Sequence, residues 1–415
     1  MTYQETLDYI YAKLPMYQNI GKSAFKKDLD NITALCASLG NPQNKFKSIH
    51  IAGTNGKGST SHILSALYQS NNYKVGLYTS PHLVDFRERI KLNGELCSKI
   101  FVTDFIARIQ VEIERLNPSF FEITVAMAFT YFAEINVDIA IIETGLGGRL
   151  DSTNIIKPIG CIITSIGYDH KDILGDTLEL IAAEKAGIIK EETPIVIGEI
   201  QDSPKSVIID KALSVNAPYH YYVENTYQTD LAGTHQQWNI GSAMKLISLL
   251  DSVLPTSKAN NNAALLDVRS ISNFTGRWQT IYDNPLVICD VGHNEEGFGL
   301  IASQIKKLGL SPIYVLGFVK GKELSGLSDI LPKGLAYHFV KPDVIRGMNA
   351  NEALENFKNP TKDTSHSYDD LEYCLSESYA ACIDTPNSFI FVGGSNFLVA
   401  DLLLLVKENK LPWNA

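Results

Sequence analysis

The chain has 415 residues, of which 45% are apolar and 20% are charged, and its formal net charge is −10. This length predicts two or three domains with sizeable cores, because a domain takes about 150 residues. The acidic balance argues against general nucleic-acid binding, and the lack of a run of about 18 apolar residues predicts that no membrane helix is present.

The N-terminus and the cysteines indicate the compartment. The first 18 residues, MTYQETLDYIYAKLPMYQ, carry acidic side chains and lack the apolar core of a signal peptide. The six cysteines form no CxxC pair, and most lie in apolar contexts. Buried, reduced thiols in a cytoplasmic protein are therefore expected.

Apolar runs alternate with helical patterns over the first 250 residues. Short runs bounded by Gly and Pro predict buried strands, and the longer amphipathic segments predict helices. The strands are expected at 46–53, 74–80, 137–144, 159–166 and 194–198, and the helices at 59–70, 102–116, 120–135, 178–190 and 235–250. Such alternation predicts a mostly parallel sheet with helices on both faces.

A second series of the same kind follows a polar stretch at 255–275 that has little periodicity. We interpret this stretch as a domain junction, which gives domains at 1–272 and 273–415. Strands are expected at 285–290, 312–318, 336–340 and 388–394, with helices up to about residue 308 and at 369–383 and 397–408. The second domain is predicted to be a smaller, Rossmann-like α/β domain.

Polar and glycine residues follow four of the expected strands. In open parallel sheets, ligands bind beyond the carboxyl ends of the strands. The first strand ends at GTNGKGST, and the next three end at Ser80, Glu143 and the Gly167–His170 segment. These residues are therefore expected on one edge of the sheet.

The stretch GTNGKGST, residues 53–60, resembles a phosphate-binding loop with altered spacing. A strand, a glycine-rich turn with Lys57, and a hydroxyl residue opening a helix suit phosphate, because backbone N–H groups surround the oxygens. Lys57 would neutralise charge, and Ser59 or Thr60 would reach Mg²⁺. The alternative is a glycine-rich turn without a ligand.

Four other ionisable residues each have an ordinary and a functional interpretation. Glu143, after an apolar run, pairs with Arg149 or a lysine, or it binds Mg²⁺. His170 caps a helix or binds a ligand, and Lys185 is a solvated helix lysine or part of a site. Arg277 forms a structural salt bridge or stabilises phosphoryl transfer from the interdomain cleft.

Several long motifs occur in a fixed order from residue 50 to residue 400. They are GTNGKGST, TSPHL with FRERI (79–90), ETGLGGRLDSTN (143–154), SIGYDH (165–170), AEKAGIIK (183–190), LAGTHQQWN (231–239), GRW (276–278), DVGHN (290–294) and VGGS (392–395). In these motifs the chain resembles the folylpolyglutamate synthase/dihydrofolate synthase family, the folate branch of the Mur ligases.

The resemblance implies an ATP-dependent amide ligase with its active site in the interdomain cleft. The enzyme would add L-glutamate to dihydropteroate or to a reduced folate through an acyl phosphate. It would act as a monomer, with ATP and two Mg²⁺ ions and without nucleic-acid or membrane partners. A Mur ligase relative with another acceptor acid and a non-catalytic nucleotide-binding relative are the alternatives.

The resemblance also implies roles for particular residues. The phosphates would be held by Gly53, Thr54, Asn55, Gly56, Lys57, Gly58, Ser59 and Thr60. One Mg²⁺ would be bound near Ser59 by Ser80 and Glu143, and a second by His170 and a carbamylated Lys185. The remaining nucleotide contacts would come from Gln236, Asn239, Arg277, Asp290, His293 and Asn294. Lys57, His170, Lys185 and Arg277 would take part in catalysis.

The chain departs from the family pattern in the second domain. Thr275 stands where the family commonly has Pro, and Val291 stands where it commonly has Gly. Because Val disfavours positive φ, a locally different turn is expected there. A murein precursor ligase would need a UDP-binding domain before Gly53, and the 52 preceding residues are too few. Phe86, Arg87 and Glu88 are suggested as pterin or benzoate contacts.

Overall fold

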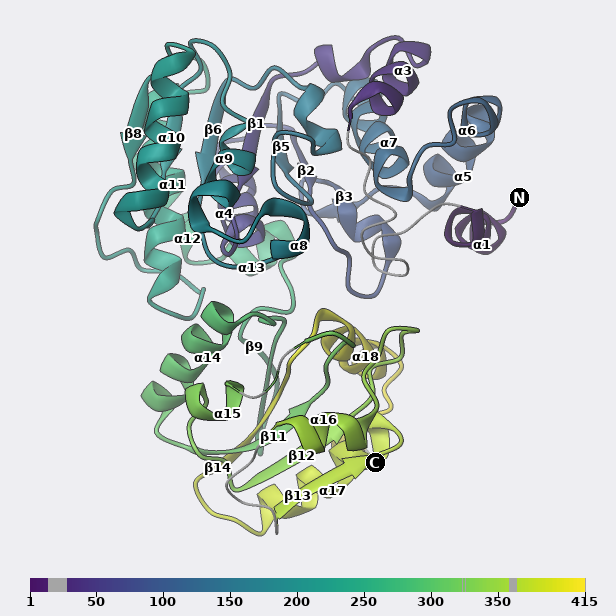
Figure 1. Ribbon diagram of the computed structural model, residues 1–415, viewed down its shortest axis with the longest axis vertical. Coiled ribbons are helices and arrows are strands. Elements are labelled where there is room, and N and C mark those ends of the chain that lie inside the picture. Colours follow the sequence, from purple (N-terminus) through teal and green to yellow (C-terminus); the bar gives the residue numbers. More distant parts are fainter. Residues whose placement is uncertain (14–27, 323, 325, 358–363, 415) are drawn as a thin grey trace. The chain divides into compact units, whose positions relative to one another are not determined.

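Figure 1 shows the computed structural model of the chain, which describes residues 1–13, 28–322, 324, 326–357 and 364–414. Residues 14–18 of the N-terminal stretch discussed above lie outside the described residues. The chain forms two compact units, one of Met1–His82 and Phe86–Phe274 and the other of Leu83–Asp85 and Thr275–Ala415. None of the helices in the described ranges has the length and apolarity needed to cross a membrane.

The first unit is built on an eight-stranded sheet with the order β4-β3-β2-β5-β1-β6-β7-β8. Its strands are β1 (Ser48–Ala52), β2 (Val75–Tyr78), β3 (Ile90–Leu92), β4 (Glu95–Leu96), β5 (Ile139–Glu143), β6 (Gly160–Ile163), β7 (Ile195–Ile197) and β8 (Tyr219–Tyr221). All pairs are parallel except β2–β3 and β3–β4. Ile51 pairs with Glu143, and Ala52 with Ile163, so the loops after β5, β1 and β6 leave the sheet side by side.

Helices cover both faces of this sheet (Figure 1). They are α1 (Tyr3–Lys13), α3 (Asp30–Ser38), α4 (Lys57–Ser70), α5 (Lys99–Arg108), α6 (Gln110–Leu116), α7 (Phe120–Glu134), α8 (Lys171–Leu174), α9 (Leu178–Ala186), α10 (Asp202–Ser214), α11 (His235–Leu250), α12 (Lys258–Leu265) and α13 (Val268–Ser272), with 3₁₀ turns at Pro42–Asn44, Phe86–Arg89 and Ser152–Ile155. Along β5, Ala140 and Ile142 pack into the core under α7, whereas Ile139 and Ile141 pack under α4 and α11. Burial on both faces explains the continuous apolar runs in the sequence.

The second unit has a six-stranded sheet with the order β13-β12-β11-β14-β10-β9. It comprises β9 (Gln279–Asp283), β10 (Leu286–Asp290), β11 (Ser311–Leu316), β12 (Ala336–Val340), β13 (Ser365–Tyr368), β14 (Ser388–Gly393), α14 (Glu295–Leu308), α15 (Leu327–Ile330), α16 (Ala350–Asn356), α17 (Leu371–Ile383), α18 (Asn396–Lys407) and a 3₁₀ turn at Pro412–Asn414. Only β9 runs antiparallel to its neighbour. The predicted fold class, two mostly parallel α/β units of unequal size, is confirmed.

Residues 255–275, which were interpreted from the sequence as a domain junction, are largely helical. This stretch forms α12 and α13, and the two compact units divide after Phe274. Ser257 caps α12 by accepting a hydrogen bond from Asn260 N, and Ala264 and Leu265 are buried in the core with α4. A short helix that buries few side chains leaves little periodicity in an asparagine-rich sequence.

The expected helix at 102–116 is also interrupted. The structure has α5 and α6 in its place, with Ile109 between them. Ser98 is the N-cap of α5 and accepts a hydrogen bond from Phe101 N, so α5 begins at Lys99, three residues before the expected start. Ile109 itself is buried, so the apolar pattern continues across the break and conceals it.

Candidate active site

The loop between β1 and α4 requires glycine at two positions. A Cβ on Gly53 would lie 1.9 Å from Thr164 Oγ1, and one on Gly56 would lie 2.4 Å from Asn239 Oδ1. Gly56 is also the N-cap of α4, with φ of 86° and, within the described residues, no side-chain cap. The first N–H groups of a helix have no partner within the helix. The start of α4 is therefore arranged to receive an anion.

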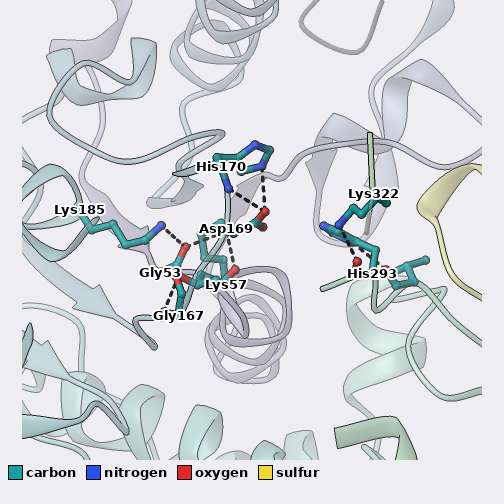
Figure 2. Close-up of polar contacts among 10 residues, drawn as sticks. Gly53, Lys57, Gly167, Asp169, His170, Lys185, His293 and Lys322 are labelled. Atoms are coloured by element: carbon teal, nitrogen blue, oxygen red, sulfur yellow. Dashed lines mark hydrogen bonds and ion pairs between the residues drawn. The ribbon is translucent and has the colours of Figure 1, made fainter. Parts of the chain in front are cut away.

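Two lysine ammonium groups converge on this loop (Figure 2). Lys57 Nζ donates to the carbonyl oxygens of Gly53 at 2.9 Å and Thr54 at 3.1 Å, and Lys185 Nζ donates to the same Gly53 oxygen at 2.8 Å. The structure thus brings together two predicted site residues that lie on α4 and α9. An anion bound here would offset the repulsion between the two positive charges.

Lys185 is not a solvated helix lysine, because its side chain is only 4% exposed. Burial, and then the charge of Lys57, lower the pKa of Lys185 to about 7, while Asp169 and Asp151 act in the opposite direction. At neutral pH a substantial fraction of Lys185 is therefore the uncharged amine. An uncharged amine is a nucleophile, which an ordinary surface lysine at this pH is not.

Glu143 ends β5 in a buried position beside α4. Its Oε2 accepts a hydrogen bond from Ser80 N at 3.1 Å, so the segment just beyond β2 meets the end of β5 as expected. A Cβ on Gly58 would lie 3.9 Å and 4.0 Å from the two carboxylate oxygens. Arg149, the partner considered from sequence, instead pairs with Glu184 at 2.7 Å. The Glu143 carboxylate therefore faces the first turn of the phosphate-loop helix.

His170 stands at the N-cap position of α8 with φ of 48°. Its backbone N–H donates to Asp169 Oδ1 at 2.9 Å, and its ring Nε2 lies 3.8 Å from the same oxygen. The side chain of His170 makes no capping hydrogen bond to α8 in the part of the chain that the structure describes. Asp169 Oδ1 thus holds the backbone of His170 and lies near its ring, as Figure 2 shows.

Gln236 and Asn239 lie in the first turn of α11 and reach the phosphate loop. Gln236 Nε2 donates to Ser59 Oγ at 3.4 Å, and Asn239 Nδ2 donates to Gln236 Oε1 at 2.9 Å. The carbonyl of the Asn239 side chain lies against Gly56. This chain of side chains supports Ser59 and Gly56. Thr60 lies outside it, because its buried hydroxyl has no hydrogen-bond partner among the described residues.

In the second unit, Asp290 organises the turn that follows β10. Its carboxylate accepts hydrogen bonds from Trp278 N at 2.8 Å and Gly292 N at 2.7 Å. Arg277 Nη1 lies 3.9 Å from Asp290 Oδ1, and its side chain is 38% exposed. This long contact is a weak ion pair, because an exposed pair contributes about 1 kcal/mol or less.

The other predicted residues of this turn have local partners. Asn294 caps α14, with its Oδ1 accepting from Gly297 N at 2.8 Å, and His293 Nδ1 lies 3.1 Å from Val291 O. Among the described residues, those with positive φ include Trp278, at 40°, but not Val291. The left-handed positions before β9 therefore include Asn273, Gly276 and Trp278, whereas the turn at Val291 after β10 does not need one at that residue.

Sequence reasoning missed two residues that hold these loops. The buried Asp151 carboxylate accepts hydrogen bonds from Gly145 N and Leu146 N at 2.8 Å each, and burial raises its pKa. It thereby shapes the glycine-rich loop after Glu143. Lys322 Nζ donates to His293 O at 2.6 Å (Figure 2). Lys322 follows the end of β11, so applying the strand-end rule to that strand would have found it.

The suggested folate contacts lie in the 3₁₀ turn Phe86–Arg89. Phe86 is buried in the core beneath α7. Arg87 Nη1 donates to Cys97 O at 3.2 Å, and the guanidinium lies 5.7 Å from the centre of the Tyr3 ring. These contacts give Phe86 and Arg87 structural roles in the first unit.

Comparison with known proteins places this geometry in a family. A model of the Mur ligase middle domain matches residues 51–242. The chain is 32% identical over 437 residues to a Bacillus subtilis protein named dihydrofolate synthase/folylpolyglutamate synthase, covering 96% of this chain and 98% of that protein.

Solved structures agree over nearly the whole chain. A Mycobacterium tuberculosis folylpolyglutamate synthase complexed with ADP and AMPPCP has a TM-score of 0.85 and 26% identity, covering 97% of this chain and 99% of that one. An FPGS–AMPPCP–folate complex has a TM-score of 0.79 and 26% identity, covering 98% and 100%. Because sequence and fold agree over nearly the whole length of both chains, the chain belongs to the dihydrofolate synthase/folylpolyglutamate synthase family.

Proposed function

We propose that this chain is an ATP-dependent ligase that joins the amino group of L-glutamate to the carboxylate of a folate-type acceptor. The convergence of Lys57 and Lys185 on the Gly53 carbonyl, at the uncapped start of α4, carries the proposal. The Lys57 ammonium group and a helix N-terminus suit the phosphates of a nucleotide. Relatives named for this reaction, and related structures with nucleotide and folate bound, support the substrate classes.

A carboxylate needs activation before an amine attacks it. In the proposed reaction the acceptor carboxylate oxygen attacks the γ-phosphorus of ATP, which gives an acyl phosphate and ADP. The glutamate nitrogen then attacks the acyl carbon, phosphate leaves, and the nitrogen loses a proton. Phosphorylation thus converts a poor leaving group into a good one. The acceptor would be dihydropteroate, a reduced folate or both.

The phosphate loop, Gly53 to Thr60, would bind the nucleotide with Lys57 as its cation. Lys57 must exchange its bonds to Gly53 and Thr54 for phosphate oxygens, which a flexible side chain on the first helical residue can do. Asn239 and Gln236 would hold Gly56 and Ser59 in place through the contacts described above.

The donors around Glu143 fit Mg²⁺, which prefers oxygen ligands and uses one or two carboxylates together with substrate phosphates. Glu143, Ser80 and Ser59 would supply them, with Glu143 facing Gly58. The described residues contain no group of three or more His, Cys, Asp or Glu side chains suited to a metal ion. When bound, Mg²⁺ would offset the charge that develops on the phosphoryl oxygens.

We further propose that Lys185 is carbamylated and, with His170, helps bind a second Mg²⁺. The lowered pKa of Lys185 supports this, because only the neutral amine reacts with CO₂. The reaction forms an N–C bond, releases one proton and leaves an anionic carbamate. A carbamate would be attracted to Lys57 and to metal ions, whereas an ammonium group is repelled by both.

Arg277, Asp290, His293 and Asn294 of the second unit are proposed to contribute to nucleotide binding, Asp290 and Asn294 chiefly by shaping the turn. Arg277→Ala is expected to reduce kcat/KM about ten- to hundredfold, the equivalent of one charged hydrogen bond. The expected loss of stability is small, because Arg277 is partly exposed and its Asp290 contact is 3.9 Å long.

The Arg277→Ala variant should be compared with Arg108→Ala, which removes an exposed pair with Glu134 at 2.7 Å. Steady-state kinetics and thermal unfolding would be measured on both variants. Equal losses of rate and stability in Arg277→Ala would favour a purely structural role for this arginine.

The proposed function is tested by ADP release and mass detection of products. The full chain would be given MgATP and L-glutamate, with dihydropteroate or tetrahydrofolate in separate reactions. Glutamylation of both acceptors would establish a bifunctional ligase. Glutamylation of only one acceptor would establish a ligase specific for that acceptor. No product in folded, ATP-binding protein would point to another acceptor acid or a non-catalytic relative. Size measurement in the same preparation would test the expectation of a monomer.

A further inference from the structure

The position of Thr54 in the phosphate loop suggests a contact with phosphate, but its hydroxyl is bonded to the backbone of Gly167 instead. Its hydroxyl donates to Gly167 O at 3.1 Å and accepts from Gly167 N at 3.0 Å, although the two residues are 113 positions apart. Thr54 is 9% exposed. The hydroxyl proton and one acceptor position are thus both used by the backbone of Gly167, which is drawn in Figure 2.

The Thr54–Gly167 pair is one end of a continuous seam between the phosphate loop and the segment after β6. Thr54 N donates to Ser165 O at 2.9 Å, Asn55 N donates to Ser165 Oγ at 2.9 Å, and Thr164 Oγ1 donates to Asn55 O at 2.6 Å. The strands β1 and β6 are parallel neighbours, so their following loops start side by side. The hydrogen bonds of the seam therefore continue the pairing of β1 and β6 beyond the ends of the strands.

The segment that the seam holds leads directly to His170. Gly167 is three residues before His170, whose backbone N–H donates to Asp169 Oδ1 and whose ring lies 3.8 Å from the same oxygen. A displacement of the phosphate loop would therefore move Gly167 through two hydrogen bonds at once. The bonds to Asn55, by contrast, end at Thr164 and Ser165, next to the rigid end of β6.

We propose that Thr54 is a positioning residue that couples the phosphate loop to the Asp169–His170 turn. This inference rests on the proposed function, with nucleotide at the loop and Mg²⁺ near His170. Binding at one place would then strengthen binding at the other, because coupling between two sites is reciprocal. The coupling acts through a closed pair of hydrogen bonds rather than through contact of Thr54 with phosphate.

The test measures coupling directly in the full chain, with ADP and Mg²⁺ as probes. Thr54→Val keeps the shape of the side chain but removes the hydroxyl, and Thr54→Ser keeps the hydroxyl. Calorimetry gives the factor by which Mg²⁺ strengthens ADP binding, and hydrogen-exchange mass spectrometry follows a peptide spanning residues 165–172. We expect Mg²⁺ and ADP to slow exchange of this peptide in the wild type and in Thr54→Ser.

In Thr54→Val, this protection should be lost, and the Mg²⁺ factor should fall about tenfold, as expected for the loss of one or two neutral hydrogen bonds. An unchanged Mg²⁺ factor in Thr54→Val, even with a lower Tm, would overturn the coupling and leave a structural role. If Thr54→Val does not fold, hydrogen exchange in the wild type still tests the inference. ADP binding that leaves residues 165–172 unprotected in the wild type would contradict it. Absence of ADP binding in folded wild type would instead overturn the proposed function, and this inference with it.

Discussion

Lys185→Ala is expected to lower the ligation rate at least about 1,000-fold while leaving the fold intact. A loss of about 4 kcal/mol in transition-state stabilisation corresponds to this factor, and metal-assisted charge stabilisation is of that size. The alanine variant loses the proposed carbamate and, with it, a bridge to the second Mg²⁺. Product formation, ADP binding and thermal unfolding would be measured together.

The pH dependence of the activity provides an independent test of the proposed carbamylation of Lys185. Because the pKa of Lys185 is lowered to about 7, the neutral amine increases as pH rises through this value. Carbamate should therefore form above about pH 7 and be lost below it, and CO₂-free buffer should reduce activity most at low pH. Carbon-13 NMR with labelled CO₂ would detect a carbamate signal that is absent in Lys185→Ala.

Two comparisons separate this role from a general effect of removing a lysine. Lys205→Ala removes a partly exposed lysine that pairs with Asp202 on α10, and the rate of this variant should equal that of the wild type. Formate or acetate should partly restore Lys185→Ala, because a small carboxylate can occupy the space left by the side chain. Wild-type turnover in Lys185→Ala would eliminate the bridging role.

Glu143→Gln is expected to reduce kcat about 100-fold or more and to raise the Mg²⁺ concentration needed for half-maximal rate. Glutamine has nearly the same shape and can still accept the hydrogen bond from Ser80 N, so the change removes mainly the negative charge. Stability without Mg²⁺ should not fall, since an ionised carboxylate is costly in a buried position. A Mg²⁺ titration of rate and of ADP binding measures both effects.

The matched control is Glu134→Gln, which alters an exposed carboxylate paired with Arg108. Its Mg²⁺ titration should coincide with that of the wild type. A Glu143→Gln variant with the same Mg²⁺ requirement as the wild type would remove Glu143 from the proposed metal site, and the Ser80 contact would then be its role.

Local sequence patterns determined much of the framework. Strands β2 and β5 were expected because their residues are apolar on both faces, β1 because Ile49 and Ile51 alternate along it, and α4 because its apolar residues recur with helical spacing. Both the apolar runs of the strands and the helical spacing of α4 are patterns among residues that lie close together in the sequence. The same locality explains why α12 was not expected, since this helix is recognisable only by the few side chains it buries against α4.

For the candidate site, the sequence by itself supplied the strand-end residues and the glycine loop, and its motifs supplied the family. Only the tertiary structure decided that Lys185 meets Gly53 from 132 residues away, that Arg149 pairs with Glu184, and that Thr54 turns toward Gly167. The strand order β5-β1-β6 and the packing of α9 create these contacts. The lowered pKa of Lys185 follows from them, because burial and a neighbouring charge are properties of the folded surroundings, which no local pattern of residues encodes.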